Sequence, residues 1–289
     1  MLKLLSLFIN TFTYLNNTEF IQNHNHQNLS FDVEENQFIN QTYENEFNIN
    51  THPIEILKHE YFIEDYDYDK YEKSIDWRER NKVSSVKNQG DCGSCWSFSA
   101  VGAIESLWAI HKNQLYNLSE QELIDCSGRY GNKGCQGGSM DGAFQYVIDN
   151  GLCSNISYPY LGEQSLCDKD NCETLVKISN YSDIIQNNEK ILEKVLHQQP
   201  ISVAIQANKR SFQFYKSGIY SDPDCGEQLD HGVLLVGYGY DKKYDMKYWI
   251  VKNSWSSSWG ENGYIRIQKD IQDPRGLCGI AMTPSIPLL

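Results

Sequence analysis

Two cysteines lie close together in the stretch QGDCGSCWSF, residues 89–98. A CxxC pair such as Cys92 and Cys95 can be a redox dithiol, half of a zinc site, or a structural cysteine beside a nucleophile. Zinc sites need four converging ligands, usually from two such pairs, and this chain has one CxxC. A thioredoxin-type dithiol follows the first strand of a small domain, whereas about 90 residues precede this pair. The third interpretation, with Cys95 as the nucleophile, is therefore favoured.

The total of nine cysteines agrees with one free thiol, because an odd number in a globular region suggests pairs plus one left over. All nine lie after residue 90, and this density predicts an oxidising compartment. Glycosylation sequons support secretion only weakly in an Asn-rich chain; they lie at Asn16, Asn28, Asn40, Asn117, Asn155 and Asn180.

Cys95 opens the nearly uncharged run CWSFSAVGAIESLWAI, whose apolar residues recur all round, as in a helix buried in a core. Gly93 and Ser94 would form a tight entry that places Cys95 at the helix N-terminus. Unpaired N–H groups and the helix dipole favour an anion there, so we expect a lowered thiol pKa and a thiolate. The alternative is an inert cysteine that begins a core helix.

A thiolate nucleophile needs a cationic partner that later protonates the leaving amine, and histidine suits this role. Five of the seven histidines lie within residues 1–111, which leaves His197 and His231 downstream. His197 ends the helical stretch KILEKVLHQQP, where a surface histidine is the simpler interpretation. His231 begins HGVLLVGYGY, whose alternating apolar pattern predicts a strand. We therefore predict His231 as the partner.

Two amide side chains complete the candidate site. Asn253, in YWIVKNSWSSSWG, would hold the imidazole, and Trp255 would cover that hydrogen bond. The oxyanion formed on attack needs donors, for which we predict the backbone N–H of Cys95 and the side chain of Gln89. The alternatives are a polar turn residue for Asn253 and an exposed loop residue for Gln89.

From about residue 72 to 289 the chain resembles papain-like cysteine proteases of the cathepsin L type. The resemblance is carried by CGSCW, LSEQELIDC, GCQGGSMDGAFQYVIDNG, PISVAIQA, LDHGVLLVGYG and YWIVKNSWSSSWGENGYIRI. It implies that Cys95, His231 and Asn253 are catalytic and that Gln89 and Cys95 form the oxyanion hole. It also implies an α+β fold of two domains, a helical left domain and an antiparallel β-barrel-like right domain, with the active-site cleft between them. The expected activity is that of a cysteine endopeptidase without metal or cofactor; the alternative is a catalytically inactive papain-like binding protein.

The resemblance also assigns the other cysteines and the substrate site. It implies the pairs Cys92–Cys135, Cys126–Cys167 and Cys225–Cys278, and we predict that the remaining Cys153 and Cys172 bridge each other. The substrate-binding residues that it implies are Gly137, Gly138, Ser139, Met140, Ala204, Leu229, Asp230, Gly232, Trp255 and Thr283. A specificity pocket made of Met140, Ala204, Leu229, Gly232 and Thr283 contains no acidic residue. We therefore expect a preference for a bulky apolar side chain two residues before the cleaved bond, at P2.

Helices and strands must position these residues. The left domain would contain the helix at 95–110, the SEQELIDC helix with Ser119 and Glu122 as a capping box, and a helix at 139–150 stopped by Gly151. The right domain would contain strands near 200–207, 231–240, 247–253 and 263–268. Ser256 stands where the family usually has glycine, and we expect it to affect the loop near Asn253.

Residues 1–72 differ from residues 73–289 and predict a separate segment, since they carry a net charge of −10 of the total −13. The stretch NTEFIQNHN resembles the end of the propeptide helix of these proteases, with Asn17, Ile21 and Asn25 at four-residue steps; ENQFINQTYENEF resembles the following motif imperfectly. The start, MLKLLSLFINTFTYL, suggests a signal-like or amphipathic segment. We expect a shortened inhibitory propeptide that occupies the cleft and leaves when acidification protonates its carboxylates.

Charge and hydropathy argue against two kinds of partner, nucleic acid and the membrane interior. A net charge of −13 argues against nucleic acid, which is bound by a basic face, and no run of eighteen apolar residues suggests a membrane span. The expected partners are peptide and protein substrates, the chain's own propeptide and inhibitors of the cystatin type. We expect a monomer in a lysosomal or secreted location.

Overall fold

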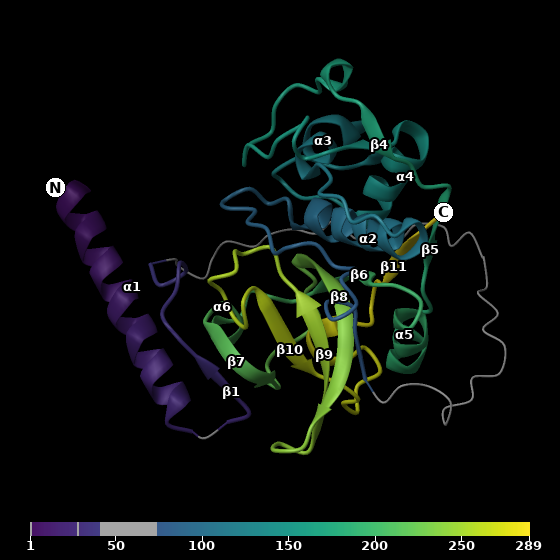
Figure 1. The fold of residues 1–289 in the computed structure, drawn as a ribbon. Helices are drawn as coiled ribbons and strands as arrows, with labels where there is room; N and C mark the ends of the chain where they lie inside the picture. Colours follow the sequence, from purple (N-terminus) through teal and green to yellow (C-terminus); the bar gives the residue numbers. More distant parts are fainter. Residues whose placement is uncertain (1, 28, 41–73) are drawn as a thin grey trace.

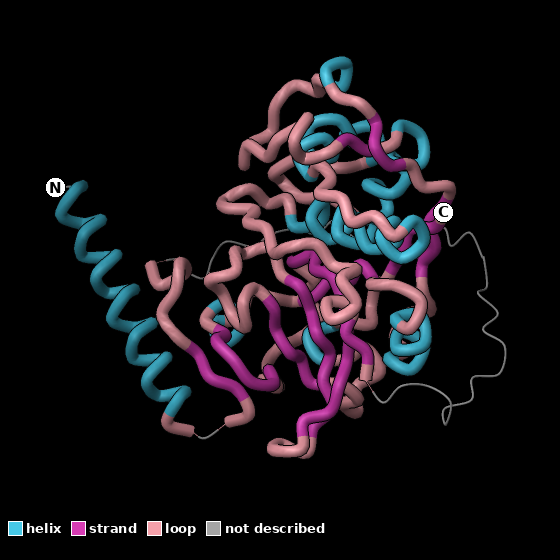
Figure 2. Tube along the Cα trace, in the orientation of Figure 1, coloured by secondary structure: helices cyan, strands magenta, loops and turns pink. Residues whose placement is uncertain are grey.

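The chain folds into a helical layer and a sheet layer, which lie one above the other in Figures 1 and 2. This computed structural model describes residues 2–27, 29–40 and 74–289. The expected boundary between residues 72 and 73, and residues 41–47 of the second N-terminal motif, lie outside the described residues.

The helical layer is built around α2 (Cys95–Lys112), which matches the buried helix predicted there. α3 (Glu120–Cys126), the 3-10 turn η1 (Ser127–Tyr130) and α4 (Met140–Asn150) lie around it. Ser139 caps α4 by accepting the Gly142 N–H, and Gly151 ends it with φ of +71°. A small hairpin of β3 (Leu152–Cys153) and β4 (Thr174–Val176), with the 3-10 turn η2 (Lys169–Asn171), completes the layer.

The main sheet follows the order β1-β7-β10-β9-β8-β6-β11-β5, and β2 pairs with β8. Four strands were predicted: β6 (Ile201–Ile205), β8 (His231–Asp241), β9 (Met246–Lys252) and β10 (Tyr264–Gln268). The others are β1 (Phe31–Val33), β2 (Ile75–Asp76), β5 (Asn180–Asp183), β7 (Tyr215–Tyr220) and β11 (Ser285–Leu288). Short helical pieces flank the sheet: α5 (Glu189–Leu196), α6 (Arg210–Gln213) and η3 (Leu277–Gly279).

The helical layer beside a mostly antiparallel sheet confirms the expected α+β fold, although within the described residues the sheet is open and does not close into a barrel. Its two end strands, β1 and β5, pair with inner strands and not with each other. β1 packs against α1 and β5 against α4, so a helix covers each edge. β7 and β10 are also parallel, because the antiparallel steps from β8 to β9 to β10 bring the chain back in the direction of β7.

The two layers meet where α2 lies on β8. The Ser99 hydroxyl donates to the carbonyl of Val233 at 2.7 Å. A Cβ on Gly102 would lie 3.0 Å from Leu234 Cδ2, so glycine lets the helix approach the strand closely. This contact fixes the start of α2 relative to the start of β8.

The N-terminal segment lies along the outer edge of the sheet, where α1 (Leu2–Asn25) and β1 stand beside β7 in Figure 1. The three residues of the predicted propeptide motif hold this segment together. Asn17 is fully buried and donates to the Ile39 carbonyl at 2.8 Å. Asn25 exchanges two hydrogen bonds with the backbone of Val33, and Ile21 is buried in the core.

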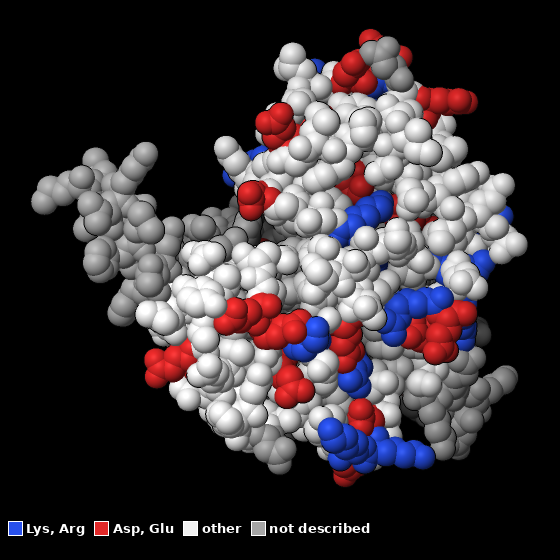
Figure 3. Space-filling model, turned by 60° about the vertical axis from the view of Figure 1, so that its left-hand side comes forward, with Lys and Arg blue, Asp and Glu red and all other residues white. Residues whose placement is uncertain are grey.

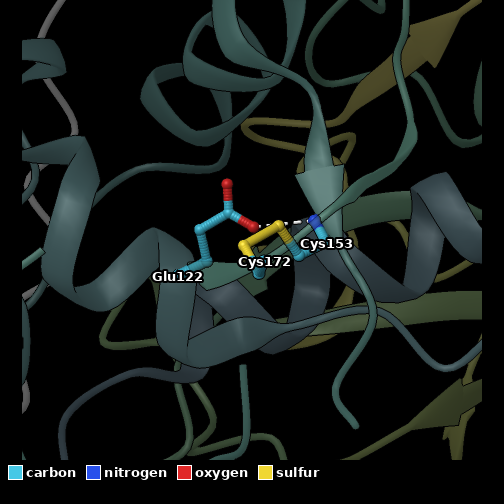
Figure 4. A group of neighbouring side chains, drawn as sticks. All are labelled: Glu122, Cys153 and Cys172. Carbon is cyan, nitrogen blue, oxygen red and sulfur yellow. Dashed lines mark hydrogen bonds between the residues drawn. A yellow bond between two sulfur atoms is a disulfide. The ribbon is translucent and has the colours of Figure 1, made fainter. Parts of the chain in front are cut away.

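Four disulfides join Cys92–Cys135, Cys126–Cys167, Cys153–Cys172 and Cys225–Cys278, the pairs expected from the sequence. Glu122 lies beside the Cys153–Cys172 bridge and accepts the Cys153 N–H at 2.7 Å (Figure 4). The predicted capping box is therefore only half formed. Ser119 accepts the Glu122 N–H, but the Glu122 carboxylate binds Cys153 and Tyr146 instead of returning to the Ser119 backbone.

Acidic and basic side chains are interspersed on the face of the described residues drawn in Figure 3, and the basic ones do not gather into one field there. None of the helices in the described residues is both long enough and apolar enough to cross a membrane.

Candidate active site

Cys95 is the first residue of α2, and its free thiol is buried, with 2% of the residue exposed. Burial raises the pKa of this thiol to about 11, while hydrogen bonds from the N–H groups of Gly232 and Trp96 oppose the shift. The expected lowering of the Cys95 pKa is therefore wrong for this structure. The helix terminus does supply an N–H to the sulfur, but removal of the thiol from water is the larger effect.

His231 is the first residue of β8 and is 3% exposed. Its Nε2 lies 2.7 Å from Asn253 Oδ1, and the Ser254 N–H also points at that oxygen, at 2.7 Å. Because the Ser254 N–H can only donate, the Asn253 atom is an acceptor, and Nε2 of His231 carries a hydrogen. The neutral imidazole then has Nδ1 free of a proton, as a general base for the thiol requires.

The environment of His231 favours the neutral ring. Burial lowers the pKa of His231 to about 4, and the Asn253 hydrogen bond opposes this shift. Trp255 stacks on the imidazole with ring centroids 4.6 Å apart and planes 27° apart. The indole thus shields the His231–Asn253 hydrogen bond, in the position that the sequence predicts for it.

Gln89 is 2% exposed and is held at both ends of its amide. Its Oε1 accepts the Ser254 hydroxyl at 2.6 Å, and its Nε2 donates to the Cys92 carbonyl at 2.9 Å. An amide nitrogen carries two hydrogens, so Nε2 retains a second N–H bond for an oxyanion. The exposed-loop alternative for Gln89 is incompatible with this burial.

The segments that carry these residues are in direct contact. Gly232 follows His231, and a Cβ at Gly232 would lie 3.1 Å from Trp96 Cα and 3.2 Å from the Cys95 carbonyl oxygen. Any side chain at Gly232 would therefore push the start of β8 away from the start of α2. Its N–H, which hydrogen-bonds the Cys95 sulfur, belongs to the same close approach.

The predicted substrate-binding residues come from five segments of the chain: 137–140, 204, 229–232, 255 and 283. Ala204 on β6 lies opposite Gly232 on β8, and Met140 begins α4. Leu229 is partly buried, and Asp230 accepts the Ala207 N–H at 2.7 Å. The Oγ1 of Thr283 is buried and has no hydrogen-bond partner among the described residues.

The structure itself explains why glycine occupies positions 137 and 138, just before α4. Gly137 has φ of +104°, which side chains rarely adopt. A Cβ at Gly138 would lie 2.7 Å from the Trp96 ring and 2.5 Å from Asn132 Oδ1. Backbone conformation thus favours glycine at 137 and packing favours it at 138, and their contact with a substrate backbone remains a prediction.

Sequence reasoning missed two residues that hold the site. Ser254 donates its hydroxyl to Gln89 and its N–H to Asn253, so it links the two amides. The position of Ser254 directly after Asn253 is the one sequence feature that could have indicated this role. The Tyr160 hydroxyl donates to the Gln89 carbonyl at 2.6 Å and contacts Ser94, a long-range contact with no local sequence pattern.

The two rival chemistries are not supported by the geometry. Cys92 is bonded to Cys135, so it is not the partner of Cys95 in a redox dithiol. Within the described residues, one group of candidate metal ligands is close enough together: Glu122, Cys153 and Cys172 (Figure 4). Its two sulfurs form a disulfide, and only the thiolate form of cysteine ligates metals.

Comparison with known families gives one match that covers most of the chain. The family described as papain family cysteine protease matches residues 71–288. The chain is 42% identical to the KDEL-tailed cysteine endopeptidase CEP2 of Arabidopsis thaliana over 95% of its own length and 78% of the relative. It is 43% identical to the probable cysteine protease RD21B of the same plant, again over 95% of its length but only 60% of that relative.

A solved structure agrees with these sequence matches. The proform of the ragweed pollen allergen Amb a 11, a cysteine protease, superposes with a TM-score of 0.87 at 35% identity. The superposition covers 97% of this chain and 80% of the other, and so includes the N-terminal segment.

Proposed function

Because the chain belongs to the papain family and is a cysteine peptidase, we propose that Cys95 is its nucleophile and that it cleaves internal peptide bonds after a bulky apolar P2 residue. The observation that carries this proposal is the connected set of Cys95, His231, Asn253 and Gln89. Their four segments meet at the contact of α2 with β8, and each side chain is buried.

The geometry supports the following sequence of steps. His231 Nδ1 takes the Cys95 proton as the sulfur attacks the substrate carbonyl carbon. The Cys95 N–H, in the first turn of α2, and the second N–H of Gln89 hydrogen-bond the oxyanion. His231 then delivers its proton to the leaving amine and leaves a thioester on Cys95. Water, deprotonated by His231, hydrolyses the thioester and restores the thiol.

The proposed P2 preference depends on the pocket residues Met140, Ala204, Leu229, Gly232 and Thr283. Met140 and Ala204 are buried, and Ala204 lies next to Gly232 across the strands. None of the five carries a charge, so a cationic P2 side chain would be desolvated without a partner. An apolar side chain bears no such cost.

We also propose that residues 1–72 form an inhibitory propeptide and that residues 73–289 form the mature peptidase. Gln37 donates to the Trp255 carbonyl at 3.1 Å, and Phe38 packs edge-on to Trp255 at 4.8 Å between ring centroids. The segment thus contacts the residue that stacks on His231. Its release on acidification would place the enzyme's work in a lysosome-like or extracellular compartment, where cystatin-type inhibitors would be its regulators.

Peptide turnover tests the proposal. The full chain is incubated at pH 4–5 and assayed with end-blocked, internally quenched peptides that carry leucine, phenylalanine or arginine at P2. We expect cleavage of the apolar peptides with kcat/KM higher by about tenfold or more than for the arginine peptide. A Cys95→Ala chain gives the background. Equal cleavage of all three peptides contradicts the specificity, and cleavage by Cys95→Ala contradicts the mechanism.

A further inference from the structure

Four ionisable side chains outside the catalytic set lie where the two layers meet, and three of them are buried. Glu105 on α2 is fully buried, Glu120 on α3 is 2% exposed, and Lys252 at the end of β9 is 8% exposed. Lys87 precedes α2 in the chain, and its side chain is 16% exposed. We call these residues, with Ser84, the interlayer cluster.

Glu105 is the centre of the interlayer cluster. It accepts hydrogen bonds from Lys87 Nζ at 2.8 Å, from the Leu118 N–H at 2.8 Å and from the Ser84 hydroxyl. Lys87 also bonds Glu120 at 2.5 Å. Lys252 joins through Ser84, because its Nζ donates to Ser84 Oγ at 2.9 Å. Two ammonium and two carboxylate groups therefore face one another.

Two members of the cluster lie one or two residues along the chain from the catalytic amides. Lys87 comes two residues before Gln89, and Lys252 directly precedes Asn253. The two segments are bonded side by side: the Gln89 N–H donates to the Ser254 carbonyl at 2.8 Å, and the Ser256 N–H to the Lys87 carbonyl at 3.2 Å. Glu105 extends this connection to α2, whose first residue is Cys95.

The cluster and the catalytic amide border the same space. A cavity of about 20 Å³, with room for about one water molecule, lies between the layers. Its polar lining includes Lys87, Glu105, Glu120, Lys252, Asn253 and Ser254. Asn253 therefore adjoins the cluster both along the backbone, through Lys252, and across this cavity.

The fold acts differently on the charges of the two lysines in the interlayer cluster. Burial opposes the charge of Lys87, but Glu105 and Glu120 outweigh it and raise the pKa of Lys87. For Lys252 burial is the larger effect and lowers the pKa to about 8, although Glu105 opposes that shift. The charged form of Lys252 is thus less stable in the fold than in water. Because apolar side chains in place of a buried charge are often neutral or stabilising, the retained charge of Lys252 points to a positioning role.

We propose that the interlayer cluster is a positioning device for the catalytic reaction: Lys87 and Lys252, drawn to Glu105 and Glu120, hold Gln89 and Asn253 in register with Cys95. Lys252 and Ser84 are then positioning residues that act through Asn253. This proposal rests on the proposed peptidase function. Displacement of a catalytic group by about 1 Å costs on the order of 100-fold in rate, so a small shift of Asn253 is measurable.

The test compares Lys252→Met and Ser84→Ala in the full chain with Lys269→Met. Lys269 is a matched control, because it is also a buried ammonium, paired with Glu193 and Asp270 beyond β10 and apart from the site. We measure kcat, KM, the thermal midpoint, and the rate of Cys95 alkylation by iodoacetamide against pH. The pH dependence of alkylation measures the ionisation of Cys95 beside His231, and it does not require peptide turnover.

The expected result is a fall in kcat of about tenfold or more for Lys252→Met and of several-fold for Ser84→Ala, with KM within twofold and a shifted alkylation profile. Lys269→Met should keep kcat and the profile within twofold while its thermal midpoint falls. The proposal is overturned if Lys252→Met and Ser84→Ala keep wild-type kcat and profile. If Lys252→Met does not fold, the test rests on Ser84→Ala, which removes only one hydroxyl group. Absence of turnover in the wild-type chain would defeat the proposed function, whereas the alkylation profiles would still decide the positioning role.

Discussion

At the scale of single residues, the pKa of the Cys95 thiol is a balance of two opposing effects, its position at a helix N-terminus and its burial. A helix terminus stabilises an anion by about 0.3–1 kcal/mol, whereas the rise of the Cys95 pKa from 9.0 to about 11 corresponds to about 3 kcal/mol. Burial therefore outweighs the helix, and burial depends on segments distant in sequence.

Asn253 should contribute to turnover and not to substrate binding. Asn253→Ala removes the acceptor of the 2.7 Å hydrogen bond from His231 Nε2. A hydrogen bond to a group that becomes charged contributes about 1.5–3 kcal/mol, so we expect kcat to fall by about 10- to 100-fold with KM within twofold. Steady-state kinetics measure this. Asn180→Ala, at an exposed residue of β5, is the control, and an equal effect of the two substitutions would contradict the role of Asn253.

At the scale of elements, segments with a clear apolar pattern or a cap were predictable and the others were not. α2, α4, β6, β8, β9 and β10 follow from apolar patterns and caps. β5 (NYSD), β7 (YKSGIY) and β11 (SIPL) were missed because polar residues, glycine or proline interrupt their apolar pattern. The predicted hydrogen bond between Glu122 and the Ser119 backbone was wrong because a residue distant in sequence binds the carboxylate instead. The Cys153 N–H, 31 residues away, takes the carboxylate that the local pattern assigned to the helix start.

The loop after Asn253 contains a residue in an unfavourable conformation. Ser256 has φ of +72°, in the region that favours glycine. We expect Ser256→Gly to raise the free energy of unfolding by about 1 kcal/mol. Chemical denaturation measures it, with Ser258→Gly in the same turn as the control. Ser258 is not in the left-handed region, so glycine there should lower stability. If Ser256→Gly lowered the free energy of unfolding as much as Ser258→Gly, the left-handed conformation of Ser256 would not be destabilising, and the prediction would be wrong.

At the scale of the whole molecule, the N-terminal segment packs against the sheet, and Ile21, Phe31 and Val33 belong to the same hydrophobic core. The charge difference between residues 1–72 and 73–289 predicts a separate segment, but not where that segment docks. The structure shows docking through β1 on β7, with Lys216–Glu34 as an ion pair at 2.5 Å. Edge pairing of strands is set by shape and register and has no signature in a three-residue strand.

The docked segment contains a buried histidine that should respond to pH. His24 lies under Phe31, with Nε2 3.3 Å from the Phe31 carbonyl, and burial lowers its pKa below 6.5 although Asp222 and Asp32 oppose this. The docked state therefore binds fewer protons than the released one. The contribution of His24 to docking is complete above pH 6.5 and is lost as the pH falls through the lowered pKa.

His24→Gln should make release of the N-terminal segment less dependent on pH, because glutamine can still donate to Phe31 but does not titrate. We expect slower conversion at pH 5 and unchanged conversion at pH 7, followed by mass spectrometry. His26→Gln, at an exposed position two residues along, is the control and should behave as wild type. The prediction fails if His24→Gln and His26→Gln convert at the same rate at pH 5.

The most direct test of the central claim is a stoichiometric label on the nucleophile. The full chain, processed at pH 4–5, is treated with increasing amounts of an epoxysuccinyl thiol-protease inhibitor, and residual turnover of an apolar-P2 peptide is plotted against label bound. The account predicts one label per chain, on Cys95, with turnover lost in proportion and the eight other cysteines in disulfides. Turnover that persists in chains labelled at Cys95, or a label that maps to another residue, would contradict it.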